Sequence, residues 1–201
     1  MKTLLIIIGL GVGLCVILIG VWVYVVQNVE TPDYVVERSA GAIEIRRYPS
    51  LTLAEVAETG PRRAALSNGF SPLARYIFAR DRSGPSIAMT APVTQRPEGE
   101  DAAAERWSVG FILPAEYTLA ELPAPASDAV RFSIWPERLM AAIRFSGHAS
   151  DADIAANESA LRDWLTAEGL TPVGPPVYAY YNDPFTPGFL RRNEVLIPLE
   201  P

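Results

Sequence analysis

The sequence predicts an α+β domain that is built from two copies of a strand–helix–strand–strand unit and is preceded by one transmembrane helix. The main observation is an internal duplication, because residues 42–60 (AIEIRRYPSLTLAEVAETG) align without a gap with residues 129–147 (AVRFSIWPERLMAAIRFSG). Alanine, proline, alanine and glycine recur at matching positions, and apolar residues coincide between them. Two copies related by a pseudo-twofold axis can bury apolar sheet faces that one copy would leave exposed.

The N-terminal segment predicts a membrane anchor. Residues 3–26 contain no charged side chain, and as a helix they would span roughly 36 Å, enough to cross a bilayer core of ~30 Å. A cleaved signal peptide is the alternative, because Lys2 supplies a positive start, but the apolar run exceeds the usual length for one. We therefore expect residues 1–27 to form an uncleaved transmembrane helix, residues 28–33 a linker, and residues 34–201 the folded domain.

Composition limits the chemistry of this domain. The whole chain has a net charge of −6 and its only lysine is Lys2, so the folded part is strongly acidic, which argues against a nucleic-acid partner. The single cysteine, Cys15, lies in the predicted anchor, so we expect neither a disulfide nor thiolate chemistry in the folded domain. The short positive N-terminal tail favours export of that domain across the membrane, although arginines after the anchor weaken this orientation.

The first repeat, residues 42–114, begins with two predicted strands. Residues 34–45 alternate apolar and charged side chains, which is typical of a strand with one solvated face. The Tyr48–Pro49 pair breaks the alternation, and residues 51–57 resume it, so we expect the second strand to pair with the first.

A helix follows, because Leu66, Phe70, Leu73 and Ile77 recur at the spacing of one apolar helical stripe. Pro72 leaves two alternatives, a helix that Ser71 caps just before the proline or a longer helix that the proline kinks. The remaining elements of this repeat are a strand over residues 87–94 that Pro92 interrupts, an acidic loop over 95–106 and a strand over 107–113.

The second repeat, residues 129–198, follows the same course after a proline-rich connection. Ser150 and Asp153 resemble a capping box, and the helix that they start carries an apolar stripe and ends near Gly169. We expect the last two strands over residues 177–181 and 194–199.

Few residues in the folded part offer catalytic or metal-binding chemistry. His148 is the only histidine, which excludes zinc sites built from His and Cys and leaves three alternatives, an exposed turn residue, a haem axial ligand or a proton shuttle. Met89 is either a soft ligand or a core residue. Four glutamates are candidates for acid–base work, but no spacing pairs them: Glu44, Glu55, Glu58 and Glu194. Arginines 191 and 192 either tie the last loop to Glu194 or hold a ligand carboxylate.

Several stretches together resemble the SOUL haem-binding protein family. They are IEIRRYP at 43–49, LARYIF at 73–78, IAMTAPV at 87–93, RFSG at 144–147 and TPGFLRRNEV at 186–195. The resemblance implies a distorted antiparallel β-barrel flanked by two helices, with two pseudo-symmetric βαββ units. It also implies non-covalent binding or carriage of haem or another tetrapyrrole. With the predicted anchor and its orientation, we expect a bacterial, membrane-anchored member whose domain lies on the periplasmic or extracytoplasmic side of the inner membrane.

The resemblance also suggests where the tetrapyrrole would lie. It implies an apolar surface on the first helix, with arginines near the propionates; the corresponding residues here are Leu66, Phe70, Leu73, Ile77, Arg62, Arg63 and Arg75. Some animal members have a histidine, proposed as axial ligand, where this chain has Arg47, and a guanidinium cannot ligate iron. Haem would then bind by apolar contact alone or through His148 or Met89.

Two other functions remain open. The duplicated architecture also resembles GyrI-like small-molecule-binding domains, some of which hydrolyse ligands with a glutamate in a central cleft, and a pocket lined by a desolvated glutamate would favour that activity. A non-catalytic interaction module is the third hypothesis. We expect a binding protein rather than an enzyme.

Overall fold

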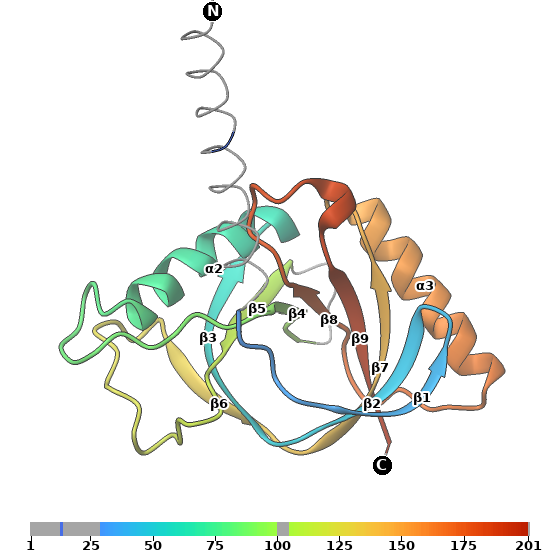
Figure 1. Cartoon of the computed structure of the whole chain (residues 1–201), viewed down its shortest axis with the longest axis horizontal. Helices are drawn as coiled ribbons and strands as arrows, with labels where there is room; N and C mark the ends of the chain where they lie inside the picture. The colour runs from blue at the N-terminus through green and yellow to red at the C-terminus, as the bar shows by residue number, and fades with distance from the viewer. Residues whose placement is uncertain (1–12, 14–28, 100–104, 201) are drawn as a thin grey trace, which may run out of the picture.

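The computed structural model describes residues 13, 29–99 and 105–200 of the chain (Figure 1). The described part contains a nine-stranded sheet and two long helices, which confirms the α+β class. The strands are β1 (Val35–Ala40), β2 (Ile43–Tyr48), β3 (Leu51–Thr59), β4 (Val93–Pro97), β5 (Arg106–Ile112), β6 (Arg131–Trp135), β7 (Arg138–Phe145), β8 (Val177–Tyr180) and β9 (Asn193–Leu199). The helices are α2 (Arg62–Ile77), α3 (Asp151–Ala167) and the short 3-10 helix η2 (Gly188–Leu190).

The strand order β1-β2-β7-β9-β8-β4-β5-β3-β6 is symmetric about the β8–β4 pair. With β1 left aside, the strands of the two repeats correspond across this centre: β8 to β4, β9 to β5, β7 to β3 and β2 to β6. Each repeat has two strands before its helix, so the unit is ββαββ and not the predicted βαββ. All strand pairs are antiparallel, but β1 and β6 each have one neighbour, so the described residues form a curved open sheet where a closed barrel was expected.

The pairing of the first strands differs from the sequence prediction. β2 does not pair with β3; it pairs with β7 of the second repeat, while β3 pairs with β5 and with β6 of the second repeat. Alternation of apolar and polar residues indicates which face of a strand is buried, but it carries no information on the neighbouring strand. The predicted strand over 34–45 is in fact two antiparallel strands, because Gly41 adopts a left-handed conformation (φ +63°) in the turn between them.

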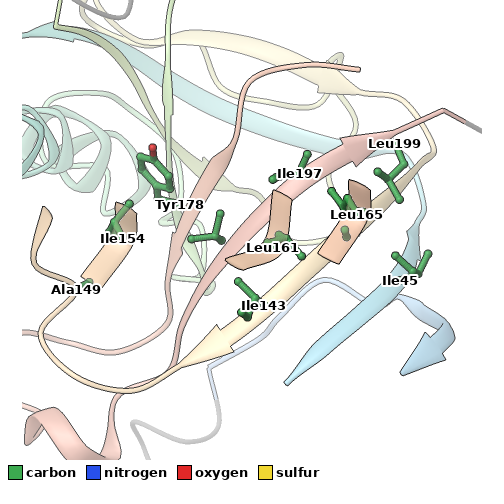
Figure 2. Close-up of a cluster of buried hydrophobic side chains, with 11 residues drawn as sticks. Ile45, Ile143, Ala149, Ile154, Leu161, Leu165, Tyr178, Ile197 and Leu199 are labelled. Carbon is green, nitrogen blue, oxygen red and sulfur yellow. The ribbon is translucent and has the colours of Figure 1, made fainter. Parts of the chain in front are cut away.

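Both helices cover the same face of the sheet. Figure 2 shows Leu161 and Leu165 of α3 packing against Ile143 and Ile197 of the strands below. α2 packs in the same way on β3 and β5. On the opposite face of the sheet, side chains such as Trp135 form a third cluster. The predicted capping box of α3 is confirmed, because Ser150 Oγ accepts a hydrogen bond from Asp153 N and Asp153 Oδ2 accepts one from Ser150 N.

Several predicted boundaries change. α2 begins at Arg62 and contains Pro72, so the alternative that starts this helix at Ser71 is wrong. The segment 87–92 is not part of a strand, and β4 begins only at Val93, after a cis peptide bond at Pro92. The predicted transmembrane helix lies outside the described residues; within them, no helix is both long and apolar enough to cross a membrane.

Candidate functional site

The apolar residues predicted on α2 divide between the core and the surface. Leu73 and Ile77 are fully buried between α2 and the sheet, and Met89 packs against the same cluster, so these three are core residues. Leu66 lies at the edge of that cluster. Phe70 packs edge-on against Phe111, with ring centroids 5.2 Å apart, yet remains 41% exposed. Only Leu66 and Phe70 therefore present apolar surface to a ligand.

Arg62 is a structural residue. Its buried guanidinium donates to Asp151 Oδ1 at 2.6 Å, to the Tyr180 hydroxyl at 2.5 Å and to the Ala149 carbonyl at 2.8 Å. These bonds fasten the first residue of α2 to the first turn of α3 and engage all three nitrogens. The prediction that Arg62 faces propionates is therefore not supported by its geometry, because its donors point to protein acceptors.

The two other arginines predicted on α2 lie at opposite ends of the helix. Arg63 is exposed in the first turn, three residues before Leu66 and seven before Phe70, a spacing that places all three along one side of the helix. Arg75 is exposed in the last turn, where its Nε lies 3.5 Å from Asp81 Oδ2.

His148 lies near the beginning of α2. Its neighbour Ala149 accepts the bond from Arg62, which brings His148 and Arg63 to the same end of the molecule. The exposed imidazole packs against the backbone of Gly188, where an added β carbon would be 2.5 Å from Cε1 of the ring. We call Arg63, Leu66, Phe70 and His148 together the apical face. Arg63 and His148 lie at the end where α2 and α3 begin, which is at the top of Figure 1, whereas Phe70 lies near the middle of α2.

The nine predicted site residues thus do not form one site. Four lie on the apical face, Arg62 supports it from below, and Leu73, Ile77, Met89 and Arg75 lie in the core or toward the other end of α2. Arg47, at the position of the family histidine, lies on β2 and pairs with Glu37 at 2.6 Å. Within residues 29–99 and 105–200 no three metal-ligating side chains gather as a metal site.

A buried polar cluster joins the two repeats on the sheet face away from the helices. The carboxylate of Glu194 on β9 accepts two bonds from Arg46 on β2, at 2.8 and 3.1 Å. It also accepts bonds from Arg192, at 3.0 and 2.8 Å, and from the Tyr181 hydroxyl at 2.8 Å. The predicted tie between Arg192 and Glu194 is confirmed, whereas Arg191 binds the carbonyls of Thr186 and Pro184.

The electrostatics of this cluster keep it ionised. Burial alone would raise the pKa of Glu194, but the hydrogen bonds and charges of Arg46 and Arg192 outweigh it and hold the pKa below the ordinary value. Burial raises the pKa of Tyr181 well above its ordinary value, and the nearby Glu194 charge raises it further. Nothing in the sequence joined Arg46 to Glu194, because they are 148 residues apart.

The second buried glutamate is also saturated with donors. Glu55 on β3 accepts bonds from the hydroxyls of Ser108 and Ser133 and lies 3.3 Å from Arg96 Nη2. Both carboxylate oxygens of Glu55 therefore have protein donors, as both oxygens of Glu194 do.

Two hollows open on the same side of the sheet. The larger, of about 230 Å³, is lined by residues 30–33, 49–52, 90, 112–115 and 117. The smaller, of about 20 Å³, has apolar walls that include Pro32, Trp135 and Tyr181. Both are below the ~300–1,000 Å³ typical of sites that enclose a small-molecule ligand, and neither is lined by Glu55 or Glu194.

The sequence of this chain matches the model of a protein family. The family model described as "SOUL heme-binding protein" matches residues 29–198, which is nearly all of the described part. Heme-binding protein 1 of Mus musculus is 26% identical over 137 residues, covering 67% of this chain and 72% of that protein.

Solved structures share the fold at lower identity. The C-terminal domain of EcmrR is 13% identical with a TM-score of 0.60, and the match covers 79% of this chain and 96% of that one. A hydrolase from Listeria innocua is 13% identical with a TM-score of 0.55, over 82% of this chain and 94% of that one. At this identity the likeness establishes the fold alone.

Proposed function

The chain belongs to the SOUL haem-binding protein family, and on that premise we propose that it binds haem or another tetrapyrrole non-covalently on its apical face. The observation that carries the proposal is the combination of the exposed Phe70 and the partly buried Leu66 with the exposed Arg63 on one side of α2. Phe70 and Leu66 offer an apolar surface for the flat macrocycle, and Arg63 offers a cation for a propionate.

The fit of a tetrapyrrole to these residues rests on their chemistry. Arg63 forms no ion pair among the described residues, so its charge is available to a carboxylate. The apical face also contains His148, whose exposed ring could reach an iron ion. Arg47 cannot ligate iron, so we propose that apolar contact provides most of the affinity and that His148 is the one candidate axial ligand on this face.

We propose binding or carriage rather than catalysis. Both buried glutamates accept several hydrogen bonds from protein donors, which leaves neither of them poised as a general base. We further propose that residues 3–26 anchor the chain in the inner membrane of a bacterium and that the folded domain lies on the periplasmic side, because the N-terminal tail is short and positive.

A titration of purified residues 29–201 with haemin, followed by Soret absorbance, tests the proposal, with iron-free protoporphyrin titrated in parallel. Saturable one-to-one binding of both ligands is expected, because the apical face contacts the macrocycle rather than the metal. Binding of haemin alone, abolished by His148→Ala, would assign the affinity to iron coordination. Failure of both ligands to saturate at micromolar concentration would contradict the proposed function.

A further inference from the structure

The loop between β8 and β9 exposes three large apolar side chains. Phe185 is 85% exposed, Phe189 is 80% exposed and Leu190 is 59% exposed, all within six residues. Single exposed apolar residues are ordinary on a soluble protein, but a cluster of this kind marks an interaction site. We call residues 182–191 the apolar loop; in Figure 1 it rises beside the start of α3.

The apolar loop is held in this conformation by its own hydrogen bonds. Asp183 Oδ1 accepts bonds from the backbone N–H of Phe185 at 2.7 Å and of Thr186 at 3.1 Å. Arg191 donates to the carbonyls of Thr186 at 2.7 Å and Pro184 at 2.6 Å. These hydrogen bonds within the loop fix its backbone, so Phe185 and Phe189 are exposed to solvent in a defined loop conformation.

The base of the loop lies beside the point where the N-terminal segment joins the sheet. Tyr181, the residue before the loop, lines the same small hollow as Pro32 and Pro92. Glu30 is fixed there as well, since its carbonyl accepts a bond from Ala91 N at 2.8 Å.

The length of chain before Glu30 limits how far the domain can be from a membrane. The apolar run of the sequence ends at Val26, four residues before Glu30. At roughly 3.5 Å per residue, the intervening chain reaches at most about 14 Å. If residues 3–26 span a bilayer, the face of the domain around Glu30 lies against the membrane surface.

We propose that the apolar loop inserts Phe185, Phe189 and Leu190 into the interfacial region of the bilayer that holds the N-terminal anchor. Aromatic side chains are favoured at the headgroup level of a bilayer. The folded domain is acidic, so general electrostatic attraction to anionic lipids would not hold it there. Gly188 of the apolar loop contacts His148, but none of the three exposed apolar side chains is among the residues of the apical face, so this proposal does not rest on tetrapyrrole binding.

A fluorescence experiment on the full chain tests the proposal. In a Cys15→Ser background, Leu190→Cys is modified with a nitrobenzoxadiazole dye, and the chain is reconstituted in phosphatidylcholine–phosphatidylglycerol vesicles. The matched control is Val173→Cys, which replaces an apolar residue of similar exposure, 52%, in the loop between α3 and β8. We expect a blue-shifted emission at position 190 that nitroxide-labelled lipids quench strongly, and little quenching at position 173.

Two results would overturn the proposal. Equal and weak quenching at both positions means that the loop faces water. A second variant combines Phe185→Ser and Phe189→Ser, and it is expected to abolish quenching of the dye at position 190. Its affinity for haemin, measured in nanodiscs and corrected for haemin that binds to empty nanodiscs, should stay unchanged. Loss of haemin affinity with quenching retained would assign the loop to the ligand site, so the two proposals fail in distinguishable ways.

Discussion

Arg46 and Glu194 form a two-bond ion pair across the junction of the two repeats, with nitrogen–oxygen distances of 2.8 and 3.1 Å, and both side chains are almost completely buried. Tyr34 stacks over the guanidinium of Arg46 at 4.4 Å, and the guanidinium of Arg192 lies over the Tyr181 ring at 3.8 Å. The cluster thus ties the segment before β1, the second strand and the C-terminal strand together.

Removing one charge from this pair is expected to destabilise the fold strongly. Glu194→Ala leaves Arg46 buried without its partner, and the free energy of unfolding should fall by about 3–5 kcal/mol, measured by urea denaturation. Glu37→Ala, which breaks the exposed pair with Arg47, is the control and should cost less than about 1 kcal/mol. Similar losses for the two variants would show that the buried pair contributes no more than a surface pair.

The same carboxylate predicts how stability depends on pH. The pKa of Glu194 is lower in the folded protein than its ordinary value of 4.5, so its stabilising effect is complete above pH 4.5 and is lost as the pH falls through the folded value. Urea denaturation of the wild type should therefore show a steeper loss of stability below pH 4.5 than Glu194→Gln, which has no carboxylate to protonate. Parallel pH profiles would contradict this assignment.

Phe70 within α2 and Phe78 at the C-terminal end of this helix provide a matched test of ligand binding at the apical face. Phe70 and Phe78 are 41% and 44% exposed, but only Phe70 lies on the apical face. Phe70→Asp should weaken haemin and protoporphyrin binding by at least about tenfold, because it puts a charge where the macrocycle would lie. Phe78→Asp should leave the affinity unchanged. Thermal unfolding of both variants checks that they are folded.

Charge reversal at Arg63 tests the contact with the propionates. Arg63→Glu should lower the affinity for protoporphyrin by roughly threefold to tenfold, since an exposed ion pair is worth about 1 kcal/mol or less and reversal adds repulsion. The affinity for the dimethyl ester of protoporphyrin should not change. Arg75→Glu, at the far end of α2, is the control; an equal loss there would point to a general effect of net charge.

Gly69 is expected to tolerate no side chain. It lies in α2 directly over Val109 on β5, and a β carbon at this position would be 2.7 Å from the β carbon of Val109. Gly69→Ala should lower the free energy of unfolding by about 1–3 kcal/mol, even though alanine favours the helix. Val109→Ala keeps the β carbon of residue 109 but removes the γ carbon that would be 2.9 Å away, so in the same chain it should recover only part of the loss. Additive effects in the double-mutant cycle would show that the added methyl group at position 69 does not clash with Val109.

The sequence predicted the features that depend on neighbouring residues. The apolar stripe of α3 and the Ser150–Asp153 capping box are local patterns, and both agree with the structure. The duplication likewise anticipated the symmetric strand order. By contrast, the partner of β2 lies in the other repeat, and only the complete sheet determines it.

The site was predicted less well for the same reason. The apolar stripe of α2 is continuous in the sequence pattern, but its residues Leu73 and Ile77 pack on the sheet. Periodicity predicts which side of a helix is apolar, and it does not distinguish residues that contact the core from residues that could contact a ligand. Arg62 and Arg63 are adjacent in sequence, yet one binds Asp151 and the other faces solvent. The acceptors of Arg62 are contributed by the second repeat, which no local pattern reveals.

The crossed pairing of β2 with β7 and of β3 with β6 has a consequence for how such a chain could arise and fold. Neither repeat can form this sheet alone, because β2 of the first repeat pairs with β7 of the second, and β6 of the second repeat pairs with β3 of the first. A single copy of the repeat could complete this sheet only by pairing with a second copy, so the chain has the arrangement of a strand-exchanged homodimer within one polypeptide. Since Ile43 must reach Ile143 before either half is complete, folding is expected to be one cooperative transition limited by a long-range search.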